Sequence, residues 1–128
     1  MTIPAARLLA LPTAAALLVV AVVHLIDGPG SLEDTFYLGA LELALAAISV
    51  PLALVLIVQP ARAVWIAIIA FMSFALALYI ASRTIGLPDA TDDLGNWGET
   101  LGVLNLAGEI AVIALASAGL WLTHSERS

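Results

Sequence analysis

The chain has 128 residues, of which 62% are hydrophobic and 11% are charged, and its mean hydropathy is +1.10. Its net charge of −6, with four arginines and no lysine, excludes nucleic-acid binding through a basic surface. The absence of cysteine excludes disulfides, thiolate metal sites and thiol catalysis. This composition is typical of a membrane protein whose main partner is the lipid bilayer.

The first apolar run covers about residues 8–26 and is long enough to cross a bilayer. It follows Arg7, as in a signal peptide, but no small-residue cleavage site comes after it, so we expect a retained helix. The next segment, 27–31, contains two glycines and a proline. These residues predict a helix break and an outer loop over 27–34.

Three further spans follow, at about 35–58, 61–83 and 99–122. Glu33 and Asp34 would lie in the first turn of the second span, where the helix dipole favours acidic side chains. Gln59 and Pro60 predict a tight turn into the third span. A long outer loop, 84–98, precedes the fourth span. The whole chain, 1–128, is therefore predicted to form one transmembrane domain.

The charges predict the orientation of these spans. Arg7, Arg62 and Arg127 fall at one end of the predicted bundle, while the loops at the other end hold seven of the ten acidic residues. Under the positive-inside rule both termini are cytoplasmic. Trp65 and Trp121 would lie at the inner interface. We predict an all-α, up-down antiparallel four-helix bundle that is integral to the cell membrane (inner or plasma), with both termini inside.

Polar side chains within the spans gather in the outer half of this predicted bundle. A rise of about 1.5 Å per residue places them at comparable depths. Charged groups inside a membrane usually have a partner or a role. The candidate ligand or ion pocket consists of His24, Tyr37, Glu42, Tyr79, Arg83, Asn105 and Glu109.

Several interpretations of these residues are open. Arg83 most simply forms a structural ion pair with Glu42 or Glu109, and otherwise could capture an anion or a lipid headgroup. Glu109 could be a carboxylic acid hydrogen-bonded to Asn105, or a proton or cation site. His24, Glu42 and Glu109 could hold a divalent metal, since imidazole and carboxylates suit iron, zinc or manganese. The paired Glu and His spacing of di-iron bundles is missing, however.

A short internal similarity relates the second and fourth spans. LGALELA at 38–44 matches LGVLNLA at 101–107 in five of seven positions. A true duplication would make Glu42 and Asn105 equivalent positions. Because leucine and alanine are abundant in this chain, the match could also arise by chance.

The outer loop adds a cluster of Asp89, Asp92, Asp93 and Asn96. It could bind calcium but lacks the spacing of an EF-hand, so a solvated acidic loop is the default interpretation. The sequence contains no nucleophile-elbow serine, Walker-type loop or dinucleotide-type glycine loop. It therefore predicts no catalytic residue and no cofactor.

The stretch from 79 to 109 carries a recognisable pattern. It contains Ser82-Arg83-Thr84 followed by Gly86-Leu87-Pro88, then Glu99 and Glu109, with His24 and Tyr37-x-Gly39 upstream. This pattern resembles uncharacterised four-span membrane proteins of high-GC actinobacterial type. The resemblance covers most of the chain and implies a four-helix membrane fold without a known activity.

Three functional classes fit these observations. The first is a structural or accessory membrane subunit with an outward-facing polar pocket, as a homo-oligomer or within a larger complex. The second is an oligomeric, proton-coupled solute or ion carrier that uses Glu42 or Glu109. The third is an intramembrane metal- or quinone-binding redox protein.

Overall fold

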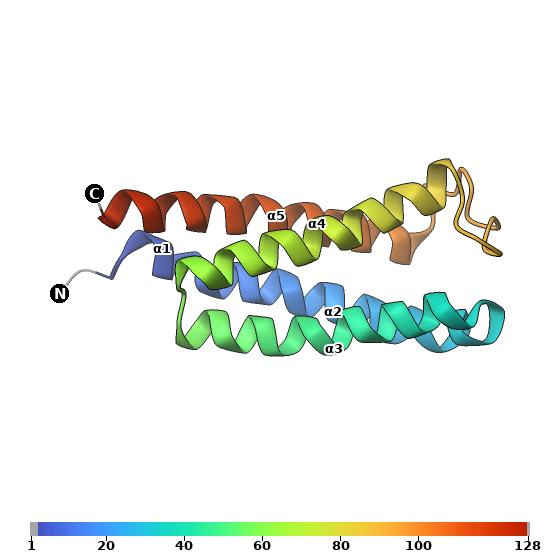
Figure 1. The fold of residues 1–128 in the computed structure, drawn as a ribbon, viewed down its shortest axis with the longest axis horizontal. Helices are drawn as coiled ribbons and strands as arrows, with labels where there is room; N and C mark the ends of the chain where they lie inside the picture. The colour runs from blue at the N-terminus through green and yellow to red at the C-terminus, as the bar shows by residue number, and fades with distance from the viewer. Residues whose placement is uncertain (1–2, 128) are drawn as a thin grey trace.

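Four long helices make up the protein, and each is apolar and long enough to cross a membrane. The computed structural model describes residues 3–127. A short helix α1 (Ala5–Leu8) leads into α2 (Ala10–Asp34), which is followed by α3 (Phe36–Val58), α4 (Arg62–Thr84) and α5 (Thr100–Arg127) (Figure 1). No β-strand occurs within the described residues. The predicted all-α bundle of four spans is confirmed.

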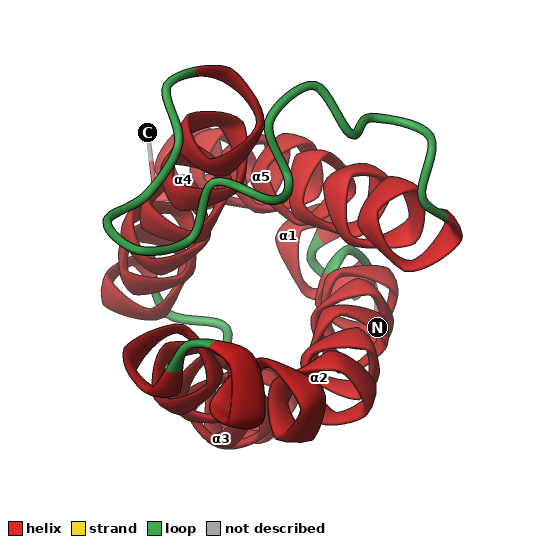
Figure 2. Cartoon of the chain, turned by 90° about the vertical axis from the view of Figure 1, so that its right-hand side faces the viewer, coloured by secondary structure: helices red, strands yellow, loops and turns green. Residues whose placement is uncertain are grey.

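Consecutive long helices run in opposite directions, so the chain begins and ends at the same end of the bundle (Figure 1). Viewed from the other end, α2, α3, α4 and α5 lie in order around a common axis (Figure 2). The helices α2 and α3 pack along their whole length, whereas α3 and α4 make few contacts. From the short turn at Gln59 and Pro60, α4 diverges from α3 toward the loop 85–99 (Figure 1).

The half of the bundle nearer the chain termini, called the terminal half below, has a filled core. Leu17, Leu56, Trp65 and Ile68 are completely buried there. Trp65 lies against α5 at Gly119, where an added Cβ would come within 2.7 Å of the indole ring. The indole of Trp65 therefore lies inside the bundle, where the missing side chain of Gly119 gives it room. Its position at the depth of the inner interface stays a prediction.

In the half nearer the loop 85–99, called the loop half below, the first span is longer than predicted. The segment 27–34, predicted to be an outer loop, is helical, and α2 ends only at Asp34. Glu33 and Asp34 consequently lie in the last turn of α2 rather than the first turn of α3. A single residue, Thr35, has an extended conformation and connects the two helices.

Close packing between α2 and α3 explains why the helix continues through glycine and proline. A Cβ at Gly28 would lie 2.8 Å from Leu43 Cδ2, and one at Gly39 would lie 2.3 Å from the backbone nitrogen of Leu32. Small residues allow such close approach between membrane helices. Contact with α3 thus offsets the local cost of Gly28 and Pro29 inside α2.

Candidate functional site

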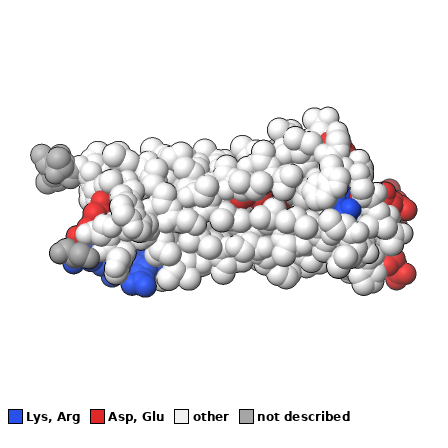
Figure 3. All heavy atoms as spheres, turned by 90° about the horizontal axis from the view of Figure 1, so that it is seen from above, with Lys and Arg blue, Asp and Glu red and all other residues white. Residues whose placement is uncertain are grey.

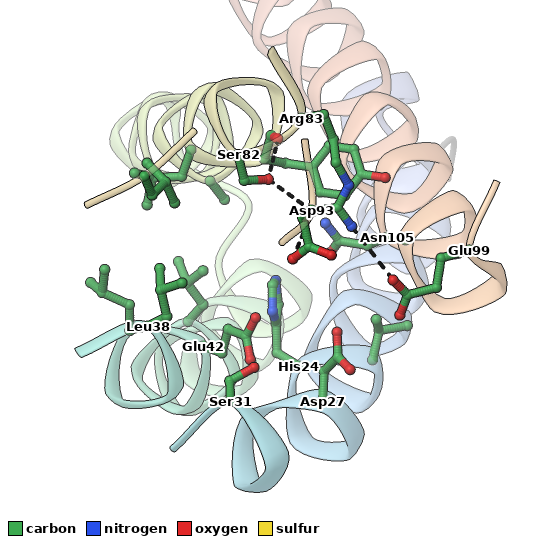
Figure 4. A pocket seen from close by; sticks show the side chains of 18 of the residues that line it. His24, Asp27, Ser31, Leu38, Glu42, Ser82, Arg83, Asp93, Glu99 and Asn105 are labelled. Carbon is green, nitrogen blue, oxygen red and sulfur yellow. Dashed lines mark hydrogen bonds and ion pairs between the residues drawn. The ribbon is translucent and has the colours of Figure 1, made fainter. Parts of the chain in front are cut away.

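A partly open cavity of about 300 Å³ occupies the loop half and is lined by α2, α3, α4, α5 and the loop 85–99 (Figure 4). Acidic side chains dominate its polar lining. They are Asp27, Asp34, Glu42, Asp93, Glu99 and Glu109. Against these six carboxyl groups, the basic side chains among the described lining residues are Arg83 and His24. Acidic atoms are visible within the apolar length of the bundle as well as at its loop end (Figure 3).

The deepest polar group of the cavity is the carboxyl of Glu109, which is completely buried. The side-chain amide of Asn105 donates a hydrogen bond of 2.9 Å to Glu109 Oε1. His24 Nε2 lies 3.9 Å from the same oxygen. The expected hydrogen bond between Asn105 and Glu109 is thus present within α5, and the imidazole of His24 in α2 lies near the same carboxyl group.

The helical spacing of α5 explains why these groups converge. Gly102, Asn105 and Glu109 follow one another at intervals of three and four residues and share one buried face. A Cβ at Gly102 would lie 2.8 Å from the hydroxyl oxygen of Tyr79 and 3.1 Å from Arg83 Nη2. Glycine at this position therefore lets two polar side chains of α4 approach α5.

Arg83 connects the cavity to the loop 85–99. Its Nε donates to the carbonyl oxygen of Asn96 at 2.8 Å. Its Nη1 lies 3.4 Å from Asp93 Oδ2, and its Nη2 lies 3.9 Å from Glu99 Oε2. The backbone amide of Gly95 donates to the Arg83 carbonyl at 2.8 Å. Among the described residues, this arginine makes ion pairs with loop acids rather than with acids of the spans.

The predicted ion pair of Arg83 with Glu42 or Glu109 is consequently wrong. The loop brings Asp93 to the guanidinium of Arg83 (Figure 4). The guanidinium carbon also lies 4.4 Å from the centroid of the Tyr79 ring, an arrangement that favours a cation–π interaction. Glu42 instead lies beside Ser31, on the opposite side of the cavity (Figure 4).

Several buried polar atoms facing the cavity have no hydrogen-bond partner within the described part of the chain. They are His24 Nε2, Glu42 Oε2, the Tyr79 hydroxyl, Asn105 Oδ1 and Glu109 Oε2. Three of these atoms are acceptor oxygens, on Glu42, Asn105 and Glu109. A buried polar atom without a partner is costly, so such a group of atoms marks a place where a ligand can bind.

Six of the seven predicted pocket residues line this cavity: His24, Glu42, Tyr79, Arg83, Asn105 and Glu109. The seventh, Tyr37, lies outside it on the exposed start of α3, where its hydroxyl donates to the carbonyl of Pro88. Tyr37 thus fixes the loop rather than contributing to the lining. Whether the six lining residues bind a ligand remains a prediction.

The sequence prediction misses part of the α2 wall, because it places Asp27, Ser31 and Asp34 in the outer loop 27–34. All three line the cavity. Together with His24 they recur at intervals of three, four and three residues, which is the period of one helical face. This periodicity is the feature of the sequence that could have predicted the continuation of α2 through the glycines.

The predicted metal site is not supported by the geometry. Across residues 3–127, no group of three histidine and carboxylate side chains comes together in a way that could hold a metal ion. This finding applies to His24, Glu42 and Glu109 and also to the acidic cluster of the loop. In that loop, Asp93 pairs with Arg83 instead.

No protein family, curated protein or solved structure matches this chain. The likeness to four-span proteins of actinobacterial type stays a prediction. The shape and chemistry of the cavity are therefore the basis for a functional proposal.

Proposed function

We propose that this protein is a small multi-pass membrane protein whose cavity binds a small organic cation. One observation carries the proposal: three buried acceptor oxygens, on Glu42, Asn105 and Glu109, lack a hydrogen-bond donor and face one cavity. A primary ammonium group offers three N–H donors and no acceptor. It therefore complements these oxygens in both hydrogen bonding and charge.

The charge of the lining supports a cation over an anion. Arg83 already lies near Asp93 and Glu99, so its charge is compensated within the protein. Among the described residues, the basic side chain that acts on both Glu42 and Glu109 is His24, which lies 3.9 Å from Glu109 Oε1. A buried carboxylate without a counter-charge is unfavourable. A cationic ligand supplies that counter-charge, whereas an anion or lipid phosphate would add repulsion.

The arginine distribution supports the placement of this cavity on the outer side of the cell membrane. Arg7 and Arg62 lie at the terminal end of the helices, and the acidic loop lies at the opposite end. Under the positive-inside rule the termini are cytoplasmic and the cavity faces outward. In this proposal the protein is a binding subunit that works as a homo-oligomer or within a larger complex.

A second candidate function is a proton-coupled carrier. The position of Glu109 at the deepest point of the cavity favours it, because a carboxyl group there can exchange a proton for the cation. The other titratable groups that line this cavity are His24, Asp27 and Asp34 of α2, Glu42 of α3, Tyr79 and Arg83 of α4, and Asp93 and Glu99 of the loop. A carrier further requires that this carboxyl become accessible from the terminal end.

Matched probes test the proposed function in protein reconstituted into lipid nanodiscs. Hexylammonium, hexanol and hexanoate differ mainly in charge, and their binding is measured by calorimetry against empty nanodiscs. We expect binding of hexylammonium alone. Glu109→Gln and Glu42→Gln should each weaken it at least tenfold, while Glu33→Gln, an exposed acid outside the cavity, should leave it within twofold.

Equal binding of hexanol, or full binding by Glu109→Gln, would overturn the proposed function. The carrier candidate is tested separately by uptake of hexylammonium into proteoliposomes with an imposed proton gradient. Gradient-dependent uptake that is lost in Glu109→Gln supports a carrier. Binding without such uptake excludes the carrier and leaves the binding subunit.

A further inference from the structure

The walls of the cavity differ in polarity. The α2 and α5 side carries His24, Asp27, Asn105 and Glu109. The α3 and α4 side contributes polar groups as well, from Glu42, Tyr79, Ser82 and Arg83. Beside them it carries an apolar surface, called the leucine wall here, which consists of Leu38, Leu41, Leu45, Ala75 and Leu78. Leu38 lies across the cavity from Asp27 and Glu99 (Figure 4). The cavity therefore combines acidic groups with one apolar surface on α3 and α4.

The leucine wall lies where the bundle is least tightly packed. Helices α3 and α4 make few contacts with each other and diverge toward the loop (Figure 1). Leu38, Leu41 and Leu78 are consequently only partly buried, although they line an internal surface. Apolar surface of this kind is stabilised when an apolar group covers it.

We infer that the ligand is an amphipathic organic cation, with an ammonium group beside Glu42, Asn105 and Glu109 and an alkyl or aryl body on the leucine wall. This inference rests on the proposed function and specifies its substrate class. The unpartnered acceptor oxygens and the leucine wall are separate observations, and one molecule satisfies both. A ligand that bound through its positive charge alone would not need to contact the leucine wall.

The size of the cavity agrees with an amphipathic organic cation as the ligand. Its volume of about 300 Å³ is at the lower end of small-molecule sites. It is roughly ten times the share of liquid volume that one water molecule occupies. A bare inorganic cation would leave most of that space and the whole leucine wall without contacts, whereas an amine with a short apolar chain fills both.

An alkylammonium series tests the inference in the same nanodiscs. Ethyl-, butyl-, hexyl- and octylammonium carry one charge and differ only in apolar length, and binding to empty nanodiscs is subtracted. We expect the affinity to rise about three- to fourfold for each added CH₂ that contacts the wall. Equal affinity for ethyl- and octylammonium would overturn the inference while leaving cation binding intact.

A filling substitution provides the matched control. Leu41→Trp should weaken octylammonium binding at least tenfold and leave ethylammonium binding within twofold, because the new ring covers the leucine wall but not the carboxyl groups of Glu42 and Glu109. Leu104→Trp places the same ring in a separate apolar hollow between α2 and α5 and should change neither affinity. Leu38→Trp is the second wall variant if Leu41→Trp does not fold.

The possible results separate the two proposals. Octylammonium binding that is unaffected by both wall variants contradicts the inference. Octanol binding that equals octylammonium binding contradicts the proposed function itself. A chain-length dependence that is lost in the wall variants, together with a requirement for Glu109, supports both.

Discussion

The two halves of the bundle use the same four helices in different ways. In the terminal half, Trp65, Leu17 and Leu56 fill the interior and are completely buried. In the loop half, the corresponding space is a cavity lined by acidic residues on α2, α3, α5 and the loop 85–99, and by the leucine wall on α3 and α4. The comparison teaches that the packing which stabilises the fold and the polar groups which suit a ligand are separated along one bundle axis.

This separation has an energetic reason. Buried polar groups without partners destabilise a fold, and a half that contains several of them depends on another region for its stability. The filled core of the terminal half supplies that stability. The hairpin of α2 and α3 contributes as well, because its close glycine contacts extend into the loop half.

The sharpest test compares the two tryptophans that lie in the two halves. Trp65→Ala should lower the free energy of unfolding by about 3–5 kcal/mol, because it leaves a large cavity in a filled core. Trp97→Ala removes a side chain that is 43% exposed and contacts Tyr79 edge to face, so a loss of about 1 kcal/mol is expected. Thermal unfolding in detergent micelles measures both, and equal losses would contradict the division into a filled and an open half.

A second test asks how far tight packing extends into the loop half. Gly39→Ala should cost about 1–3 kcal/mol, because the new Cβ would lie 2.3 Å from the backbone nitrogen of Leu32. Gly98→Ala, where nothing lies within 4 Å of an added Cβ, is the control and should change stability little. A tolerated Gly39→Ala would show that the α2–α3 turn is looser than the contact indicates. Denaturant titration in micelles gives both values.

The smallest expected effect concerns the attachment of the loop. Arg83→Gln removes the ion pairs with Asp93 and Glu99 and should lower the free energy of unfolding by about 1 kcal/mol, since both acids are partly exposed. Hydrogen exchange of the amides in 85–99 should nevertheless become faster. Arg62→Gln, an exposed arginine at the terminal end, should leave that exchange unchanged. Unchanged exchange in Arg83→Gln would show that Tyr37 and the backbone hold the loop alone.

The local sequence was sufficient to predict the four spanning helices and their order along the chain. Apolar runs of about 20 residues require spans, because unpaired backbone groups are costly in a bilayer. Short connections between them require antiparallel neighbours. The same helical geometry allowed depth and face to be assigned for His24, Glu42, Asn105 and Glu109, which lie on the lining of one cavity.

Only the tertiary structure decided how α2 ends and which partners Arg83 has. Local propensity favours a break at Gly28 and Pro29, but contact with α3 keeps the segment helical. Gly28 packs against Leu43, fifteen positions further along the chain, and local propensity does not include such a contact. The sequence likewise contains several acids that could pair with Arg83, and the path of the loop decides that its ion pairs are with Asp93 and Glu99. Helix formation follows from nearby residues, whereas the pairing of charges and the shape of a cavity depend on how distant segments pack.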